Sequence, residues 1–385
     1  MKRCLLLVVV MLTTRSAAIT QVPTYILQRE TFNPGMISIN FSPDGSLLLA
    51  GYTDGSFRML DPETFETSLE VKEAHLKPVT AMDMPPKMDF IMTAGGNQIK
   101  LWDRDGKLKG TLNGHATTIW NADISNDGRY AVSTAINKTF LLWDVTHGTL
   151  AEHMRGHEDV TLTACISDNN KLIVSGSNDR MVKIWDLESR EVILTLHGPT
   201  GDIYDVAFSP DSRMVAAASA DESIRIYSLG EEKLLHILKG HRGVVRKVDF
   251  SPGGSYLVSA SEDHSLILWD VLNGEQVYPF TENEGAVLDV KFHPDGKSIY
   301  SVSSMGELTR WEMHPEIFVL RYYAAPYREE LSADPVFEPR RKGESRQDHE
   351  ARMAKAGPLK TTMLQRYYNQ YLEEHPGRGT VQKHP

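Results

Sequence analysis

The chain has 385 residues, 41% hydrophobic and 24% charged, which is ordinary for a folded soluble protein. The formal net charge of −10 is unevenly spread: residues 1–320 hold 29 Lys and Arg against 42 Asp and Glu, whereas residues 321–385 hold 12 against 9. Because sequence-independent nucleic-acid binding needs basic surface to displace counterions, the acidic body argues against a nucleic-acid partner.

The first residues have the order of a secretory signal peptide. Lys2 and Arg3 precede an apolar run over 5–12, and the small residues 16–18 follow as a cleavage site. The run is too short to cross a bilayer, and no later segment is apolar enough, so we expect no membrane span. Residues 1–18 are therefore expected to be removed and the protein exported, to a periplasm or outside the cell. The alternatives are a buried first strand and a cytoplasmic protein.

Seven copies of one pattern follow. Each ends in a Trp-Asp pair or a variant of it, and successive copies are 42, 41, 42, 42, 42 and 42 residues apart. These pairs begin at Leu60, Trp102, Trp143, Trp185, Tyr227, Trp269 and Trp311. A Gly-His step precedes several of them, as at Gly114-His115, and tight turns separate short runs of β-branched and aliphatic residues. The pattern predicts four short strands per unit and no helix before residue 320.

With these Trp-Asp pairs, Gly-His steps and spacings, residues 24–322 resemble the WD-repeat (WD40-type) β-propeller family. The resemblance implies an all-β fold, a seven-bladed β-propeller of four-stranded antiparallel blades, which we place at residues 19–322. Seven radial sheets bury each face against a neighbour. A terminal strand must close the ring. Residues 25–28 are favoured for this, and residues 317–320 are the competing segment.

Ser, His and Asp recur together in the repeats and, taken alone, suggest a hydrolase triad. The complete sets are His157, Ser175, Asp179 and Trp185, and His241, Ser259, Asp263 and Trp269. In the family that the chain resembles, these four residues form a buried structural hydrogen-bond chain, and an enzyme needs only one site. The third repeat has Asn137 at the Asp position, and the fifth has Pro199 at the His position. We expect no catalytic residue, no metal site and no cofactor, since no CxxC pair, HExxH motif or phosphate-binding Gly-rich loop occurs.

The resemblance also implies a binding surface, because in such propellers the Gly-His loops and the Asp turns share one face. Residues five positions after the His should form a ring around the mouth of the central channel on that face. Five of them, from consecutive repeats, are the expected partner-binding residues: Trp120, Leu162, Tyr204, Arg246 and Leu288. Trp, Tyr and Arg dominate interface energetics. The alternative is that these side chains line the channel wall and pack on one another.

The expected function is therefore a non-enzymatic scaffold that binds a protein or peptide partner. The alternatives are an intracellular adaptor and an enzyme that uses the central funnel.

The last residues do not continue the repeat. Ala325-Pro326 and Asp334-Pro335 indicate an extended linker over 323–344. Ser345 followed by Asp348 resembles a capping box that opens a helix in the tail, 345–385, and Gly357-Pro358 is expected to interrupt it. An apolar, tyrosine-rich face then recurs at helical spacing over 359–372. This face either packs back on the propeller or docks to another protein.

Overall fold

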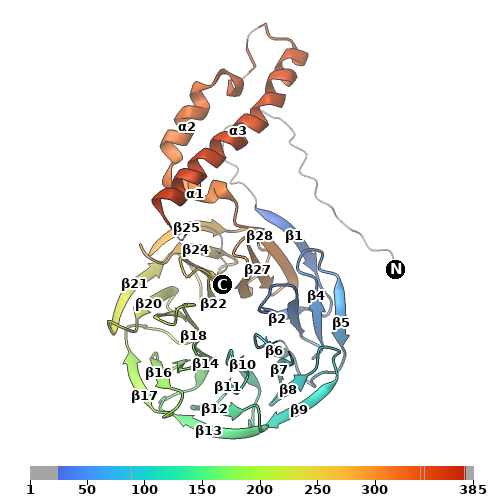
Figure 1. Cartoon of the computed structure of the whole chain (residues 1–385), viewed down its shortest axis with the longest axis vertical. Helices are drawn as coiled ribbons and strands as arrows, with labels where there is room; N and C mark the ends of the chain where they lie inside the picture. Colours follow the sequence, from blue (N-terminus) through green and yellow to red (C-terminus); the bar gives the residue numbers. More distant parts are fainter. Residues whose placement is uncertain (1–24, 88, 339, 342, 377, 379–385) are drawn as a thin grey trace.

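A computed structural model describes residues 25–87, 89–338, 340–341, 343–376 and 378. Within them, 28 strands form seven four-stranded antiparallel sheets, which stand as blades around a central axis (Figure 1). The predicted fold class, a seven-bladed propeller with a C-terminal helical extension, is confirmed. The expected signal peptide, residues 1–18, lies outside the described residues.

Blades are numbered in chain order, and the strands of each are given from the innermost outward. Blade 1 contains β2 (Met36–Phe41), β3 (Leu48–Tyr52), β4 (Phe57–Leu60) and β5 (Thr67–Val71); blade 2, β6 (Val79–Asp83), β7 (Ile91–Gly95), β8 (Gln98–Trp102) and β9 (Leu108–Asn113); blade 3, β10 (Ile119–Ile124), β11 (Tyr130–Ala135), β12 (Thr139–Asp144) and β13 (Thr149–Arg155); blade 4, β14 (Thr161–Ile166), β15 (Leu172–Ser177), β16 (Val182–Asp186) and β17 (Val192–Leu196). Blade 5 contains β18 (Ile203–Phe208), β19 (Met214–Ser219), β20 (Ser223–Ser228) and β21 (Lys233–Lys239); blade 6, β22 (Val245–Phe250), β23 (Tyr256–Ser261), β24 (Leu266–Asp270) and β25 (Glu275–Phe280); blade 7, β26 (Val287–Phe292), β27 (Ser298–Ser303), β28 (Glu307–Glu312) and, outermost, β1 (Ile26–Thr31).

The N-terminal strand closes the ring. β1 pairs antiparallel with β28, from Ile26 opposite Trp311 to Thr31 opposite Glu307. The favoured closing strand is therefore confirmed. The competing segment, 317–320, is helical instead, because His314 caps the helix by accepting from the Glu316 amide and Pro315 occupies the first turn.

The tryptophans of the five repeats that have one at this position are core residues between two blades. Trp185 of blade 4 is 1% exposed and meets Phe140 of blade 3 edge-on, with ring centroids 5.2 Å apart. Its cluster joins Val132 and Leu142 of blade 3 to Ile173 of blade 4. Large aromatic rings in such contacts bury much apolar surface, so the Trp side chains hold neighbouring blades together.

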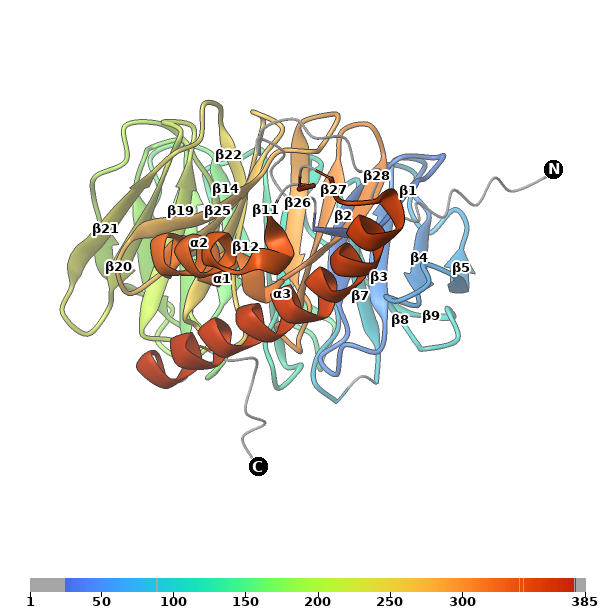
Figure 2. The same cartoon turned by 90° about the horizontal axis from the view of Figure 1, so that it is seen from above.

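Among the described residues, three α-helices and one 3-10 turn follow the last blade, at the outer edge of the ring (Figures 1 and 2). They are α1 (Pro315–Tyr322), α2 (Ala324–Ala333), η1 (Pro335–Phe337) and α3 (Arg346–Glu374). Two expectations were wrong here. A helix begins before residue 320, and 323–344 is not an extended linker, because α2 and η1 occupy much of it.

The helix α2 forms despite the Ala325-Pro326 dipeptide. Pro326 lies in the first turn, where its missing N–H is not needed for an intrahelical hydrogen bond. Tyr327 is 1% exposed and packs in a cluster with Val319 and Met363, which come from α1 and α3. Burial against neighbouring helices therefore stabilises a segment whose sequence reads locally as extended.

The helix α3 runs unbroken through Pro358, which corrects the expected interruption at Gly357-Pro358. An internal proline costs about 3 kcal/mol of helix stability. Ala356 and Met363 are buried on either side of it, so packing offsets that cost. The predicted start is confirmed, since the Ser345 side chain accepts from the Asp348 amide.

The tyrosine-rich face of α3 packs back on the rest of the chain. Tyr371 is fully buried and belongs to the same hydrophobic cluster as Tyr256 of blade 6 and Phe318 of α1. Farther on, Arg378 forms an ion pair with Asp270 of blade 6. The tyrosine-rich face was expected either to pack back on the propeller or to dock to another protein, and the structure shows it packed on the propeller. No helix among the described residues is long and apolar enough to span a membrane.

Candidate partner-binding face

Blades 4 and 6 each contain a complete hydrogen-bond chain from Trp to Asp. In blade 4, Trp185 Nε1 donates to Ser175 Oγ at 2.8 Å, and Ser175 Oγ lies 2.8 Å from His157 Nε2. His157 Nδ1 lies 2.8 Å from Asp179 Oδ2, which also accepts from the Glu158 amide at 3.0 Å. These are the contacts that the family resemblance implied for this repeat.

Blade 6 repeats the arrangement with nearly the same distances. Trp269 Nε1 donates to Ser259 Oγ at 2.8 Å, which lies 2.7 Å from His241 Nε2. His241 Nδ1 is 2.9 Å from Asp263 Oδ2, which accepts from the Arg242 amide at 2.8 Å. Because a carboxylate accepts and does not donate, the imidazole proton lies on Nδ1 in both blades.

The burial of the serine in each hydrogen-bond chain indicates that the chain has a structural role. Ser175 and Ser259 are both 0% exposed, so neither Oγ can reach a substrate carbonyl. The Gly-His step belongs to the same packing, because a Cβ on Gly156 would lie only 2.7 Å from Cη2 of Trp185. Burying such polar groups is tolerable because each is paired.

Blades 2 and 3 contain the same chain without its last member. Trp102 Nε1 donates to Thr93 Oγ1 at 2.8 Å, which is 2.8 Å from His75 Nε2. Trp143 Nε1 donates to Ser133 Oγ at 2.8 Å, which is 2.6 Å from His115 Nε2. Among the described residues, Nδ1 of His75 and Nδ1 of His115 are buried and have no hydrogen-bond partner.

Blade 5 also has a carboxylate at the Asp position, although Pro199 replaces the His. There Asp221 Oδ2 accepts from the Thr200 amide at 2.9 Å and pairs with Arg225 at 2.8 Å. Burial raises the pKa of Asp221, but hydrogen bonds from Ser223, Thr200 and Arg225 outweigh it and lower the pKa to about 2. Arg225 thus supplies the cation that compensates for the missing imidazole.

The expected binding residues share a structural position that the sequence does not reveal. In every innermost strand the register shifts at one residue, and that residue is the ring position, as between Ile119 and Asn121 or between Ile203 and Asp205. A β-bulge adds a residue without a ladder partner and redirects its side chain. Trp120, Leu162, Tyr204, Arg246 and Leu288 are all bulge residues.

The five ring side chains differ in exposure. Trp120 is 44% exposed, whereas Leu162 is 7% exposed, and Tyr204, Arg246 and Leu288 are half-buried. The Arg246 guanidinium lies over the Tyr204 ring, 4.7 Å from its centroid, and forms an ion pair with Glu262. The structure therefore brings Tyr204 and Arg246 together, leaves Trp120 free for contact and buries Leu162.

Comparison with known proteins agrees with the seven blades. The family described as "WD domain, G-beta repeat" matches residues 27–61, 66–103, 106–144, 148–186, 190–228, 232–270 and 274–305. The chain belongs to the WD40 family.

Individual relatives of this WD40 propeller match over short stretches. The LEC14B protein of Lithospermum erythrorhizon is 35% identical over 118 residues, which are 29% of this chain and 25% of the relative. Nuclear distribution protein PAC1 of Coccidioides posadasii (strain C735) is 29% identical over 126 residues, 27% of each chain. Cilia- and flagella-associated protein 52 of Homo sapiens is 24% identical over 111 residues, 28% of this chain and 18% of the relative. The matches thus span about a quarter of the relatives' length or less.

Buried and half-buried carboxylates of the innermost strands form a second polar system in this WD40 propeller, which sequence reasoning missed. Asp249 Oδ2 accepts from the Phe292 amide of blade 7 at 2.7 Å, and Asp289 Oδ2 accepts from the Ile39 amide of blade 1 at 2.8 Å. Asp83, Asp123 and Asp205 bind the next blade in the same way. Burial, and then the charge of Asp83, raises the pKa of Asp123 well above its usual range. An acidic or amide residue at matching places in several repeats was the available signal.

These carboxylates stabilise the contacts between neighbouring blades and do not form a reactive centre. Each accepts a main-chain amide of the neighbouring blade, and Lys247 and Lys291 pair with Asp205 and Asp249 at 3.0 and 3.5 Å. Among the described residues, no group of three or more His, Cys, Asp or Glu side chains is placed to hold a metal ion.

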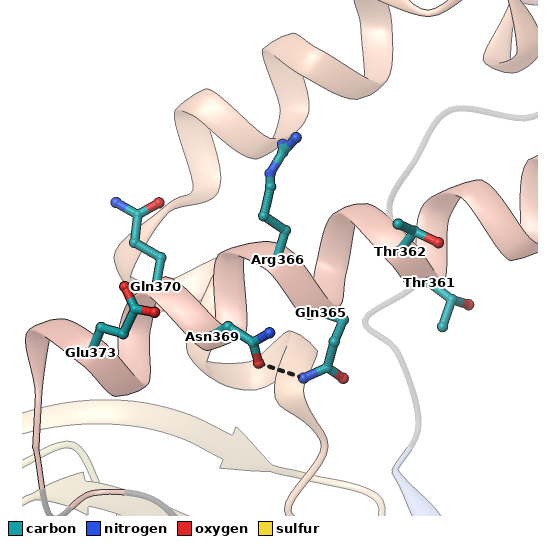
Figure 3. A pocket seen from close by; sticks show the side chains of 7 residues that line it. All are labelled: Thr361, Thr362, Gln365, Arg366, Asn369, Gln370 and Glu373. Atoms are coloured by element: carbon teal, nitrogen blue, oxygen red, sulfur yellow. Dashed lines mark hydrogen bonds between the residues drawn. The ribbon is translucent and has the colours of Figure 1, made fainter.

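An open groove also runs along α3, away from the ring residues (Figure 3). It is lined by Thr361, Thr362, Gln365, Arg366, Asn369, Gln370 and Glu373. Gln365 donates to Asn369 at 2.8 Å, and Arg366 pairs with Glu330 of α2. Most of its polar side chains already have a hydrogen-bond partner on α2 or α3, so the ring face is the stronger candidate site.

Proposed function

We propose that this WD40 propeller is a non-enzymatic scaffold that binds a protein or peptide partner through the face that carries the bulge residues. The supporting observation is Trp120, a tryptophan that stays 44% exposed on a rigid strand while the repeat tryptophans are buried. An exposed Trp at the same strand position as the half-buried Tyr and Arg side chains of other blades has the composition of an interface hot spot. The buried serines of the Trp–Asp chains, in turn, argue against hydrolysis.

A pull-down from the native source tests this proposal. The variant Trp120→Ala, Tyr204→Ala, Arg246→Ala removes three ring side chains, and we expect it to lose its partner while its circular dichroism and melting temperature stay close to those of the wild type. The matched control is Leu108→Ala, Ile193→Ala, Leu234→Ala, which removes exposed apolar side chains from three outermost strands. Retention of every partner by the folded ring variant would contradict the proposal.

Export is part of the same proposal. Its support is the order of residues 2–18, and cleavage near residue 18 would leave the closing strand β1 (Ile26–Thr31) intact. N-terminal sequencing of the mature protein tests it, and we expect a start close to residue 19. A mature protein that retains residues 1–18 would refute export.

The second candidate is an intracellular adaptor. It is favoured by the names of two similar proteins, one associated with nuclear distribution and one with cilia and flagella. The same N-terminal sequencing separates the two candidates. Both use the same face, so the ring variant tests either of them.

A further inference from the structure

Two blades of this propeller show what their Asp-binding position recognises. In blade 4, one oxygen of Asp179 is bound by His157 Nδ1 and by the Glu158 amide; in blade 6, one oxygen of Asp263 is bound by His241 Nδ1 and by the Arg242 amide. An imidazole N–H and the next main-chain N–H thus converge on one carboxylate oxygen. Charge-assisted hydrogen bonds of this kind are stronger than neutral ones.

Blades 2 and 3 carry the same histidine but not the carboxylate. Asn97 and Asn137 stand at the Asp position. Asn137 Oδ1 accepts from the Thr139 amide at 3.0 Å, and Asn97 donates to the His115 carbonyl oxygen at 3.3 Å. His75 and His115 are 3% and 5% exposed, and their Nδ1 atoms have no hydrogen-bond partner among the described residues. Two adjacent blades therefore have carboxylate donors without a carboxylate of their own.

The surface around these two positions is basic and apolar, although the propeller is acidic. The segments 76–78, 96–97, 116–118 and 136–138 contain Lys77 and Lys138 but no Asp or Glu, whereas the matching segments of blades 4 and 6 contain five carboxylates. The four segments are contiguous. Val79 pairs with Gly95 and Ile119 with Ala135 within their blades, and the Ile119 amide donates to the Gly96 carbonyl between the blades. We call this surface the blade 2–3 sector.

Large apolar side chains are exposed in and beside the same sector. Leu76 is 99% exposed, Ile136 52% and Trp120 44%. Leu76 directly follows His75, and Ile136 directly precedes Asn137. An apolar surface that lies beside carboxylate donors and two lysines complements a segment in which an acidic residue is next to a large apolar one.

We propose that the blade 2–3 sector binds an acidic peptide segment of the partner protein. A side-chain carboxylate of that segment accepts a hydrogen bond from the main-chain amide of Leu76 or Ala116, the donor that Asp179 and Asp263 bind at the matching place in blades 4 and 6. A neighbouring apolar residue of the segment packs on Trp120 and Ile136. This inference rests on the proposed function and adds to it the chemistry of the partner.

Selection from a phage-displayed library of random 12-residue peptides tests the proposal with a defined probe. We expect enriched peptides to carry an Asp or Glu next to a large apolar residue. Replacing that acid by Asn or Gln in the synthetic peptide should weaken binding about tenfold, as expected for loss of a charge-assisted hydrogen bond. Enriched peptides that bind through the ring but need no carboxylate would overturn this inference and leave the proposed function standing. No enrichment at all would count against both.

A second experiment separates the carboxylate position from general charge. Asn97→Asp with Asn137→Asp supplies an internal carboxylate to His75 and His115 and to the main-chain amides of Leu76 and Ala116. Because those amides are then occupied, we expect the selected peptides to bind at least about tenfold more weakly while the melting temperature rises. The matched control, Asn126→Asp with Asn169→Asp, adds the same charge on two exposed turns outside the sector and should weaken binding less than about threefold. Equal losses in the two variants, or unchanged binding in the first, would overturn the proposal.

Discussion

Two kinds of blade stand side by side in this ring. Blades 4 and 6 end their hydrogen-bond chains on Asp179 and Asp263, whereas the chains of blades 2 and 3 stop at His75 and His115. All four begin with the same Trp Nε1 donor. Because the Trp, Ser or Thr, and His members of the chain are shared, a comparison of the two kinds of blade shows the effect of the Asp carboxylate alone.

A complete chain is closed to other molecules, since every donor already has an acceptor within the blade. An incomplete chain retains donors whose natural acceptor is a carboxylate. Leaving such a donor buried and unsatisfied costs about 1–3 kcal/mol. A cost of this size at two neighbouring blades, beside the exposed Trp120, places a stability deficit where the proposed partner binds.

The largest expected effect comes from removing the side chain of a repeat Trp, which both kinds of blade contain. Trp185→Ala should lower the free energy of unfolding by about 3–5 kcal/mol, because it removes a 1%-exposed indole between two blades. Equilibrium urea unfolding measures this. Ser175→Ala should also destabilise the fold, and it should abolish no reaction. A near-native stability of Trp185→Ala would show that the Trp frame is not what holds the blades.

Acid should distinguish the two kinds of blade. Burial lowers the pKa of His75 and of His115 from 6.5 to about 4. Between pH 6.5 and pH 4 the unfolded chain therefore binds protons that the folded chain does not, so stability falls as the pH falls. At pH 5 the loss is about 2 kcal/mol per histidine.

Urea unfolding at pH 7.5 and pH 5.0 tests this. We expect His115→Gln to show a smaller drop than the wild type by about 2 kcal/mol. Equal drops would contradict the assignment. In blade 4 burial raises the pKa of Asp179, but hydrogen bonds from Glu158 and His157 outweigh it and lower the pKa below 3.8. Its contribution is therefore present above pH 3.8 and is lost only as the pH falls below that value.

Converting a complete chain into an incomplete one should have an intermediate effect. Asp179→Asn removes the acceptor of His157 Nδ1 and of the Glu158 amide, and should cost about 1–3 kcal/mol of unfolding free energy. Asp159→Asn is the matched control, since Asp159 is exposed and bonds only its neighbour's amide among the described contacts. Similar stabilities for the two variants would show that the carboxylate is not what completes the chain.

The reverse change should have the smallest effect. Asn97→Asp gives His75 Nδ1 a carboxylate acceptor, and we expect the free energy of unfolding to rise by about 0.5–1.5 kcal/mol at pH 7. Differential scanning calorimetry measures the accompanying rise in melting temperature. A fall instead would mean that the blade 2 turn cannot bring its carboxylate to the imidazole.

The sequence by itself determined the repeat, the number of blades and the position of the Trp cores. These follow from local patterns: turn residues, strand alternation and a Trp-Asp mark about every 42 residues. It also determined the cap at Ser345, because an N-cap hydrogen bond joins residues only three apart.

Only the tertiary structure decided the helices, the bulges and the unpaired imidazoles. The segment 315–333 is helical because Tyr327 and Val319 are buried against α3, a contact between residues far apart in the chain. The ring side chains take their directions from β-bulges, which appear only once two strands are paired in register. Asn97 and Asn137 can be recognised in the sequence as departures from the repeat. That Nδ1 of His75 and Nδ1 of His115 have no hydrogen-bond acceptor within the described part of the chain depends on the residues packed around each imidazole. Local patterns determine which elements form, whereas contacts between distant segments determine which groups remain without a partner.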